Sequence, residues 1–268
     1  MTTSATLRVP DGDLYYDLRG SGPLVVLVGA PMDARPFTGL AELLATDHLV
    51  LTTDPRGINR SRLDDPHAEA TLDLRADDLA RLIRHVDAGP AVVLGSSGGA
   101  VSVLALTQAH PDLVHTVIAH EPPLNDLLPQ REELRAGFEQ VRAMNLGGDP
   151  EGAGRLFLKL ANIELPEPVI QQMFGAGRSE QDIADDHVQH AHMMRPTLDW
   201  LPDIAKLKAA SSRVIVGIGE ASAGQICDQT SRALAQQLGI EPTMFPGGHV
   251  GFAENPAAFA LRFRAAIG

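Results

Sequence analysis

The stretch from Ala91 to Gly99 constrains the fold of this chain more than any other segment. It reads Ala-Val-Val-Leu-Gly-Ser-Ser-Gly-Gly, a short apolar run that ends in a glycine-rich corner. The segment that follows, Ala100–Ala109, has a helix-like pattern. A strand, a sharp turn and a helix are therefore predicted here, with a serine at the turn.

The corner fits the pattern Gly-x-Ser-x-Gly when Ser97 is its central residue. Such a turn holds its central residue in a strained backbone conformation, so the residues two before and two after it must be small. Gly95 and Gly99 meet this need, whereas a register centred on Ser96 would put Leu94 at a crowded position. Ser97 is therefore the candidate nucleophile. The alternative is a glycine-rich loop that only turns the chain or holds a phosphate at the helix N-terminus.

Strand and helix patterns alternate along most of the chain. Thr6–Pro10 and Leu14–Leu18 flank Asp11-Gly12 and predict an edge hairpin. Further strands are expected at Leu24–Val28, His48–Thr53, Ala91–Ser96, Thr116–Ala119, Val214–Ile218 and Thr243–Phe245, and helices at Phe37–Ala45, Leu72–Val86, Gln225–Leu238 and Pro256–Ala266. This order predicts an α/β fold with a mostly parallel sheet and helices on both faces, and the site at the carboxyl ends of the strands.

The alternation stops between residues 124 and 204. Helical patterns are clearest at Glu132–Met144, Ala153–Ala161 and Asp182–Met194, with no convincing strand between them. We expect a helical cap inserted at 124–204, between core segments 1–123 and 205–268. Such a cap would roof the site and exclude water.

Composition excludes several classes of function. A net charge of -12 over 268 residues opposes binding to nucleic acid, and the single cysteine, Cys227, rules out an internal disulfide. Met1–Pro10 lacks the apolar core of a signal peptide, and the longest apolar run, Leu24–Met32, is too short to cross a bilayer. We expect a cytoplasmic protein that acts on a small molecule and binds neither nucleic acid nor membrane. No heptad pattern indicates an oligomer.

A nucleophilic serine needs a base, and position selects among the ten histidines. His249 follows the last expected strand, in a glycine-rich loop that could reach the site. His120 follows the serine too closely to be the preferred base. The remaining candidates are read as capping or solvated residues (His85, His110 and His115) or as an incomplete metal-binding set (His187, His190 and His192). No metal is expected.

Three motifs together resemble those of the α/β-hydrolase superfamily, over nearly the whole chain. Besides Gly95–Gly99, the segment Asp54–Ser61 resembles the Asp-x-Arg-Gly-x-Gly-x-Ser turn, with Asn59 in place of the second glycine. Val26–Pro31 resembles the His-Gly-x-Pro turn, with Val28 where histidine is usual. The resemblance implies an α/β-hydrolase fold: a mostly parallel eight-stranded sheet flanked by helices, with a helical cap. It also implies an oxyanion hole formed by the backbone N–H groups of Ala30 and Gly98.

The acid that would orient His249 is open between two glutamates. The commonest pattern of the superfamily has an aspartate a few residues after Gly219, but this chain has Glu220 there. Haloalkane dehalogenases of the same superfamily use a glutamate after the strand that follows the nucleophile helix, and Glu121 matches that position. Glu121 is the preferred acid and Glu220 the alternative, with Asp228 a distant third.

The resemblance implies a serine hydrolase that cleaves a carboxylic ester or lactone through an acyl-enzyme, without a cofactor. The expected triad is Ser97, His249 and Glu121. The alternatives are a cofactor-free lyase or oxidative enzyme on the same fold, and a non-catalytic small-molecule receptor. Large apolar residues of the insertion are either pocket lining or core: Phe157, Met173, Phe174, Met193, Met194 and Trp200. Arg195 is a candidate for binding a substrate carboxylate.

Overall fold

A mixed nine-stranded sheet forms the centre of the molecule in the computed structural model, which describes residues 2–268. Its main path has the order β1-β2-β4-β3-β6-β7-β8-β9, and β5 pairs with β2 off this path. The strands are β1 (Thr2–Val9), β2 (Gly12–Gly20), β3 (Leu24–Val28), β4 (Leu49–Thr53), β5 (Arg62–Leu63), β6 (Ala91–Ser96), β7 (Val114–His120), β8 (Arg213–Gly219) and β9 (Thr243–Phe245). The predicted fold class is confirmed, but the predicted count of eight strands omits β5, because a two-residue strand carries no recognisable pattern.

The first two strands form the predicted hairpin. Val9 pairs with Gly12 at the turn, and the antiparallel register continues to Thr2 and Arg19. From β3 to β9 the pairs are parallel, except that β4 also pairs antiparallel with β2. All five side chains of β3 are buried, as expected for a strand covered on both faces.

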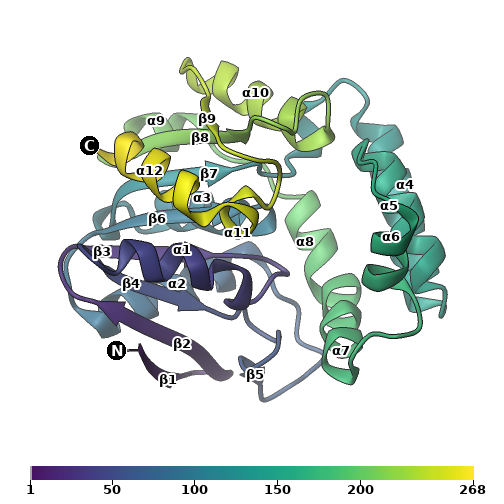
Figure 1. The fold of residues 1–268 in the computed structure, drawn as a ribbon, viewed down its shortest axis with the longest axis horizontal. Helices are drawn as coiled ribbons and strands as arrows, with labels where there is room; N and C mark the ends of the chain where they lie inside the picture. The colour runs from purple at the N-terminus through teal and green to yellow at the C-terminus, as the bar shows by residue number, and fades with distance from the viewer. Residues whose placement is uncertain (1) are drawn as a thin grey trace.

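Helices cover both faces of the sheet (Figure 1). One face packs against α2 (Leu72–Val86), α3 (Gly98–Ala109), α9 (Ile204–Ala209) and α10 (Ile226–Leu238). The other packs against α1 (Thr38–Leu44), α11 (Gly251–Glu254) and α12 (Pro256–Ile267), with a cluster of buried phenylalanines between them. None of the helices within residues 2–268 has both the length and the hydropathy of a transmembrane span.

The segment between β7 and β8 contains helices and, in the structure described, no strand. Before α9, it comprises a 3-10 turn (Asn125–Leu127), α4 (Arg131–Leu146), α5 (Pro150–Ala161), α6 (Glu167–Phe174), α7 (Glu180–Val188), a π-helical turn (Gln189–Met193) and α8 (Met194–Leu198). These elements lie beside the ends of the central strands, at the right of Figure 1. The single helix predicted over Asp182–Met194 is thus interrupted, and α6 was not predicted.

Candidate active site

The corner after β6 has Ser97 at its apex. This residue has φ 58° and ψ -128°, a strained conformation for a side chain other than glycine. A Cβ atom at Gly95 would collide with the Gly99 carbonyl group, and one at Gly99 would collide with the Val28 carbonyl group. Only glycine fits at these two positions. The predicted register, centred on Ser97, therefore agrees with the backbone.

Glu121 directly follows β7 and is completely buried. It also has a positive φ, 53°, and its backbone N–H donates to the Gly217 carbonyl oxygen at 3.0 Å. Its carboxylate Oε1 accepts a 2.8 Å hydrogen bond from the N–H of Gly219. These two hydrogen bonds to the end of β8 hold the Glu121 backbone and orient its carboxylate.

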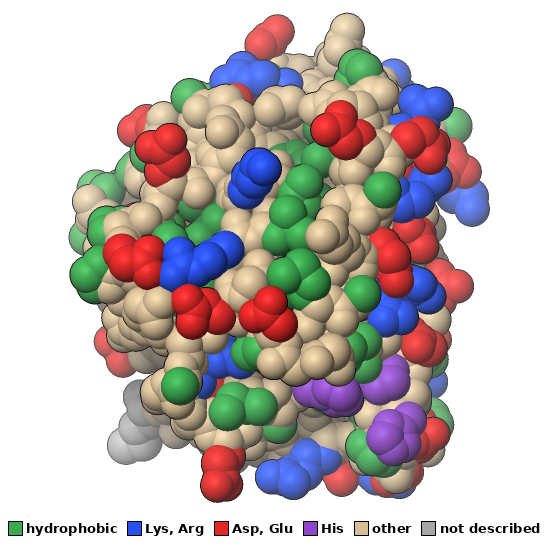
Figure 2. Space-filling view, turned by 90° about the vertical axis from the view of Figure 1, so that its right-hand side faces the viewer, with side chains coloured by type: hydrophobic (Ala, Val, Ile, Leu, Met, Phe, Trp, Pro, Cys, Tyr) green, Lys and Arg blue, Asp and Glu red, His purple; other side chains and the backbone are tan. Residues whose placement is uncertain are grey.

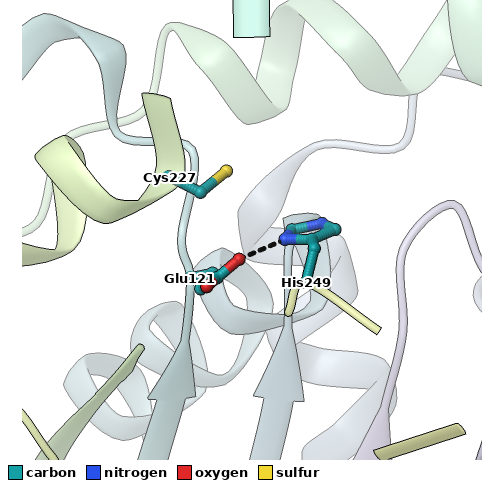
Figure 3. Close-up of side chains that lie close together, drawn as sticks. All are labelled: Glu121, Cys227 and His249. Carbon is teal, nitrogen blue, oxygen red and sulfur yellow. Dashed lines mark hydrogen bonds and ion pairs between the residues drawn. The ribbon is translucent and has the colours of Figure 1, made fainter. Parts of the chain in front are cut away.

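The second oxygen of Glu121 binds His249. Nδ1 of His249 donates to Oε2 of Glu121 at 2.5 Å, as the dashed line in Figure 3 marks. Burial disfavours the charged carboxylate, but the hydrogen bond and the charge interaction with His249 outweigh it and lower the pKa of Glu121 to about 2. An ionised Glu121 fixes the tautomer that leaves Nε2 of His249 free to act as a base.

Ser97 and His249 line the same cavity, which has a volume of about 540 Å³. Among residues 2–268, no hydrogen bond joins the Ser97 hydroxyl to the His249 ring. Such catalytic hydrogen bonds are often long without substrate and shorten in the complex. The cavity therefore exposes a hydroxyl and an imidazole to one bound molecule.

Two backbone donors lie beside Ser97 on the cavity wall. Ala30 and Gly98 both line the cavity, and their backbones are in close contact, because a Cβ at Gly98 would lie 2.6 Å from the Ala30 carbonyl oxygen. Neither N–H group has an acceptor within the described residues. Unpaired N–H groups at this position are available to a negatively charged oxygen. Asp54 supports this loop by accepting a 2.9 Å hydrogen bond from the N–H of Ala34.

Cys227, on α10, is a neighbour of the acid–histidine pair that the sequence did not indicate. Its Sγ, a Glu121 oxygen and a His249 nitrogen lie within 4.8 Å of one another (Figure 3). Ligands of a tetrahedral zinc ion lie about 3.4 Å apart, so the 2.5 Å between His249 and Glu121 is too short for both to bind one ion. Burial also raises the pKa of the Cys227 thiol, which keeps it protonated. The geometry fits a hydrogen-bonded pair with an adjacent thiol.

The structure does not bring the alternative acids to His249. Glu220 is exposed, and its side chain makes no hydrogen bond to His249. Asp228 accepts hydrogen bonds from the Gly224 N–H at 2.9 Å and from Arg232 at 2.7 Å. His120 lies behind the site, against Ser96 and three phenylalanine rings, and burial lowers the pKa of His120 to about 4.

Four of the six apolar residues proposed as pocket lining do line the cavity: Phe157, Met173, Met193 and Met194. Phe174 instead packs on Gly154, and Trp200 packs against the main core. Arg195 does not line the cavity. It forms a salt bridge with Glu139, with N–O distances of 2.7 and 2.9 Å. His190 and His192 also have other partners, the Asp186 carbonyl oxygen and Glu69.

Arg75 is a further residue that the sequence did not indicate. It is 3% exposed and forms no ion pair with any described residue. Its guanidinium group donates to the Gly98 carbonyl oxygen and to Oγ1 of Thr197, each at 2.7 Å. Both acceptor residues line the cavity, so Arg75 joins the serine corner to α8 from behind the cavity wall. Its position between Leu72 and Leu79 on the apolar stripe of α2 was the available signal.

Comparison with known proteins agrees with this fold. A family model described as the alpha/beta hydrolase family matches residues 24–262. The uncharacterized hydrolase YraK of Bacillus subtilis (strain 168) is 32% identical over 260 residues, which cover 97% of this chain and 94% of YraK. The zearalenone hydrolase of Bionectria ochroleuca is 32% identical over 163 residues, 56% of this chain and 62% of that enzyme.

A solved structure also shows a likeness in fold over nearly the whole chain. It is that of Est816, reported as an N-acyl homoserine lactone degrading enzyme, with a TM-score of 0.72 and 20% identity. The match covers 97% of this chain and 99% of Est816. Together with the family match, it leads to one conclusion: the chain belongs to the alpha/beta hydrolase family and is a hydrolase of that fold.

Proposed function

We propose that the protein is a serine hydrolase that cleaves carboxylic esters or lactones of small organic molecules through an acyl-enzyme. One observation carries the proposal: Ser97 and the His249–Glu121 pair meet at a single cavity beside two unpaired backbone N–H groups. These are the groups that acyl transfer needs, namely a nucleophile, an oriented base and donors for an oxyanion. A cytoplasmic location remains a prediction from the sequence.

In the proposed reaction, Oγ of Ser97 attacks the substrate carbonyl carbon while Nε2 of His249 takes the hydroxyl proton. The carbonyl oxygen becomes an oxyanion, which accepts hydrogen bonds from the N–H groups of Ala30 and Gly98. The intermediate collapses, the C–O bond breaks, and His249 returns the proton to the leaving alcohol. Water then attacks the acyl-enzyme with His249 again as base, which releases the acid and restores Ser97. Glu121 stabilises the imidazolium in both steps.

Two features support this proposal beyond the reactive groups. Est816, reported as an N-acyl homoserine lactone degrading enzyme, has the same fold as this chain. The helices of residues 124–204 contribute much of the cavity wall, including Phe138, Leu158 and Met194, and we assign this segment as a cap. A cap over the serine corner excludes water and strengthens electrostatic stabilisation of the oxyanion.

The test is a hydrolysis screen with p-nitrophenyl esters and lactones of graded size, run on the wild type and on Ser97→Ala. We expect turnover by the wild type and a loss of about 10⁴-fold or more in Ser97→Ala. Ser96→Ala is the matched control, because it removes the neighbouring hydroxyl and should retain most of the activity. Full activity in Ser97→Ala would overturn the proposal, as would a folded wild type that hydrolyses no ester or lactone.

A further inference from the structure

The charge of the cavity wall restricts what can bind there. Among the described residues that line it, none is lysine or arginine. Its acidic residues are Glu164 and Glu254, and both are exposed, which places their carboxylates in contact with water. A substrate carboxylate that entered the cavity would therefore leave water without meeting a lysine or arginine side chain.

The inner part of the cavity is lined by buried apolar side chains. Phe138, Leu158, Met193, Met194 and Ile226 line it, and each is at most 8% exposed. Val169 and Met173 of α6 line the outer part and are 36% and 46% exposed. Hydrophobic side chains also lie on the outer face of the helical segment, between charged groups of both signs (Figure 2). The cavity thus runs from an exposed apolar rim to a buried apolar end.

Apart from the two glutamates and the proposed reactive groups, the polar side chains of the wall offer neutral hydrogen bonds. Oγ1 of Thr197 is already engaged, because it accepts from Arg75 and donates to the Met193 carbonyl oxygen at 2.7 Å. The amides of Gln189 and Gln225 line the cavity, and neither makes a side-chain hydrogen bond to another described residue. Each could bind a hydroxyl, carbonyl or amide group of a substrate, but neither carries charge.

Neither Arg195 nor Arg75 places a positive charge in the apolar part of the cavity. Arg195 is held by Glu139 outside the cavity. The hydrogen bonds of Arg75 end on Gly98 and Thr197, which stand between its guanidinium group and the cavity. The charge of Arg75 therefore lies behind the proposed oxyanion position rather than in the apolar end that an acyl chain would fill.

We infer that the substrate is an ester or lactone whose acyl portion is uncharged and largely apolar, and that analogues with an ω-carboxylate are rejected by the cavity. This inference rests on the proposed function, since it describes the substrate of the same site. Its physical basis is that an ionised carboxylate moved from water into an apolar site without a partner is strongly disfavoured. A neutral polar substituent near Gln189 or Gln225 remains acceptable.

The first experiment compares p-nitrophenyl hexanoate with the p-nitrophenyl monoester of adipic acid, which has the same chain length and a terminal carboxylate. We expect kcat/KM for the neutral ester to exceed that for the carboxylated ester by a factor of about 100 or more. The overall charge of -12 would also repel an anion, but salt screens such long-range repulsion. A preference that persists at high salt supports the inference, and one that disappears there overturns it, as does equal hydrolysis of the two esters.

A pair of variants tests whether the side chains of the cavity wall cause the preference for the neutral ester. Gln189→Lys adds a cation to the cavity, and Gln189→Met is its uncharged control of similar length. We expect Gln189→Lys to raise the ratio of kcat/KM for the carboxylated ester to that for the neutral ester by about 10-fold or more, while Gln189→Met leaves the ratio low. Equal ratios in the two variants would overturn the inference.

Failure of the proposed function can be separated from failure of this inference. If the wild type cleaves neither ester, the proposed hydrolase function fails. A binding measurement then tests whether the cavity prefers an uncharged ligand. Hexanamide and the monoamide of adipic acid, an ω-carboxylated analogue, are titrated into Ser97→Ala by calorimetry. Preferential binding of hexanamide supports an uncharged ligand. Equal binding, stronger binding of the carboxylated amide, or no binding of either overturns it.

Discussion

Nδ1 of His249 lies 2.5 Å from Oε2 of Glu121, although the two residues are 128 positions apart in the chain. The contact joins the loop after β9 to the end of β7, and β8 lies between these strands in the sheet. The other oxygen of Glu121 is held by the N–H of Gly219 at the end of β8. The parallel order of the strands therefore brings a buried acid and a histidine together at the edge of one cavity.

Replacing Glu121 with Gln should reduce catalysis, because the amide keeps the shape but removes the charge that stabilises the imidazolium. We expect kcat to fall by about 10²–10⁴-fold. Glu220→Gln is the matched control, since its carboxylate is exposed and makes no hydrogen bond to His249. It should stay within about twofold of the wild type. Steady-state kinetics on one activated ester measures both. A larger loss in Glu220→Gln would assign the acid to Glu220 instead.

The low pKa of Glu121 predicts a specific acid response of stability. The folded protein holds this pKa at about 2, below its ordinary value, so the ionised carboxylate contributes stability at neutral pH. That contribution, about 3 kcal/mol, should be lost as the pH falls from about 4.5 through about 2. Denaturant unfolding from pH 2 to 7 measures it. The free energy of unfolding of the wild type should approach that of Glu121→Gln at the acid end, and a constant difference across this range would contradict the assignment.

Arg75 should act as a positioning residue. Arg75→Met removes hydrogen bonds from a charged donor to Gly98 and Thr197, so we expect a loss of about 2–4 kcal/mol in the free energy of unfolding and a lower kcat. Thr197→Val removes only the contact with α8, and it should raise KM with a smaller effect on kcat. Arg75→Lys keeps the charge and should restore part of kcat. Denaturant unfolding and steady-state kinetics together test this.

A double variant separates positioning from simple destabilisation. If Arg75 acts on α8 through Thr197, then Arg75→Met should itself raise KM, and adding Thr197→Val should leave that KM nearly unchanged. Independent, additive changes in KM would mean that the two residues do not act through one contact. Wild-type kinetics in Arg75→Met would limit Arg75 to a role in stability.

The sequence predicted the core sheet well because its strands are short, buried and apolar. The bounds of β3, β6 and β9 agree with the predicted segments, since each carries an apolar run that ends at a turn residue. Asn59, which stands in place of the second glycine of the Asp-x-Arg-Gly-x-Gly-x-Ser turn, adopts φ 50°. This agrees with the tolerance of asparagine for left-handed conformations. β5 and α6 were missed, because a two-residue strand and a short helix next to prolines depend on tertiary contacts.

The helical segment was harder to predict for a related reason. A continuous helix was expected over Asp182–Met194, but a π-helical turn at Gln189–Met193 interrupts it. There Nδ1 of His190 donates to the Asp186 carbonyl oxygen at 2.8 Å. Periodicity alone does not report such a change of hydrogen bonding, because the spacing of apolar residues is nearly unchanged.

Some residues of the candidate site could be predicted from the sequence, and others could not. Ser97 and Glu121 were candidates from the sequence because each lies close after a predicted strand, at the edge where the carboxyl ends of parallel strands meet. Cys227 was not a candidate, because its place beside His249 depends on how α10 packs against β8. Arg75 was not a candidate from the sequence, although its spacing places it on the buried stripe of α2.

Covalent trapping of the nucleophile tests the central claim most directly. The wild type, Ser97→Ala and His249→Ala are treated with a p-nitrophenyl alkylphosphonate, and intact mass with peptide mapping locates the product. We predict one adduct on Ser97 in the wild type, none in Ser97→Ala, and formation slowed by about 10³-fold or more in His249→Ala. A folded wild type that forms no adduct, or one that is labelled at a residue other than Ser97, would contradict the account.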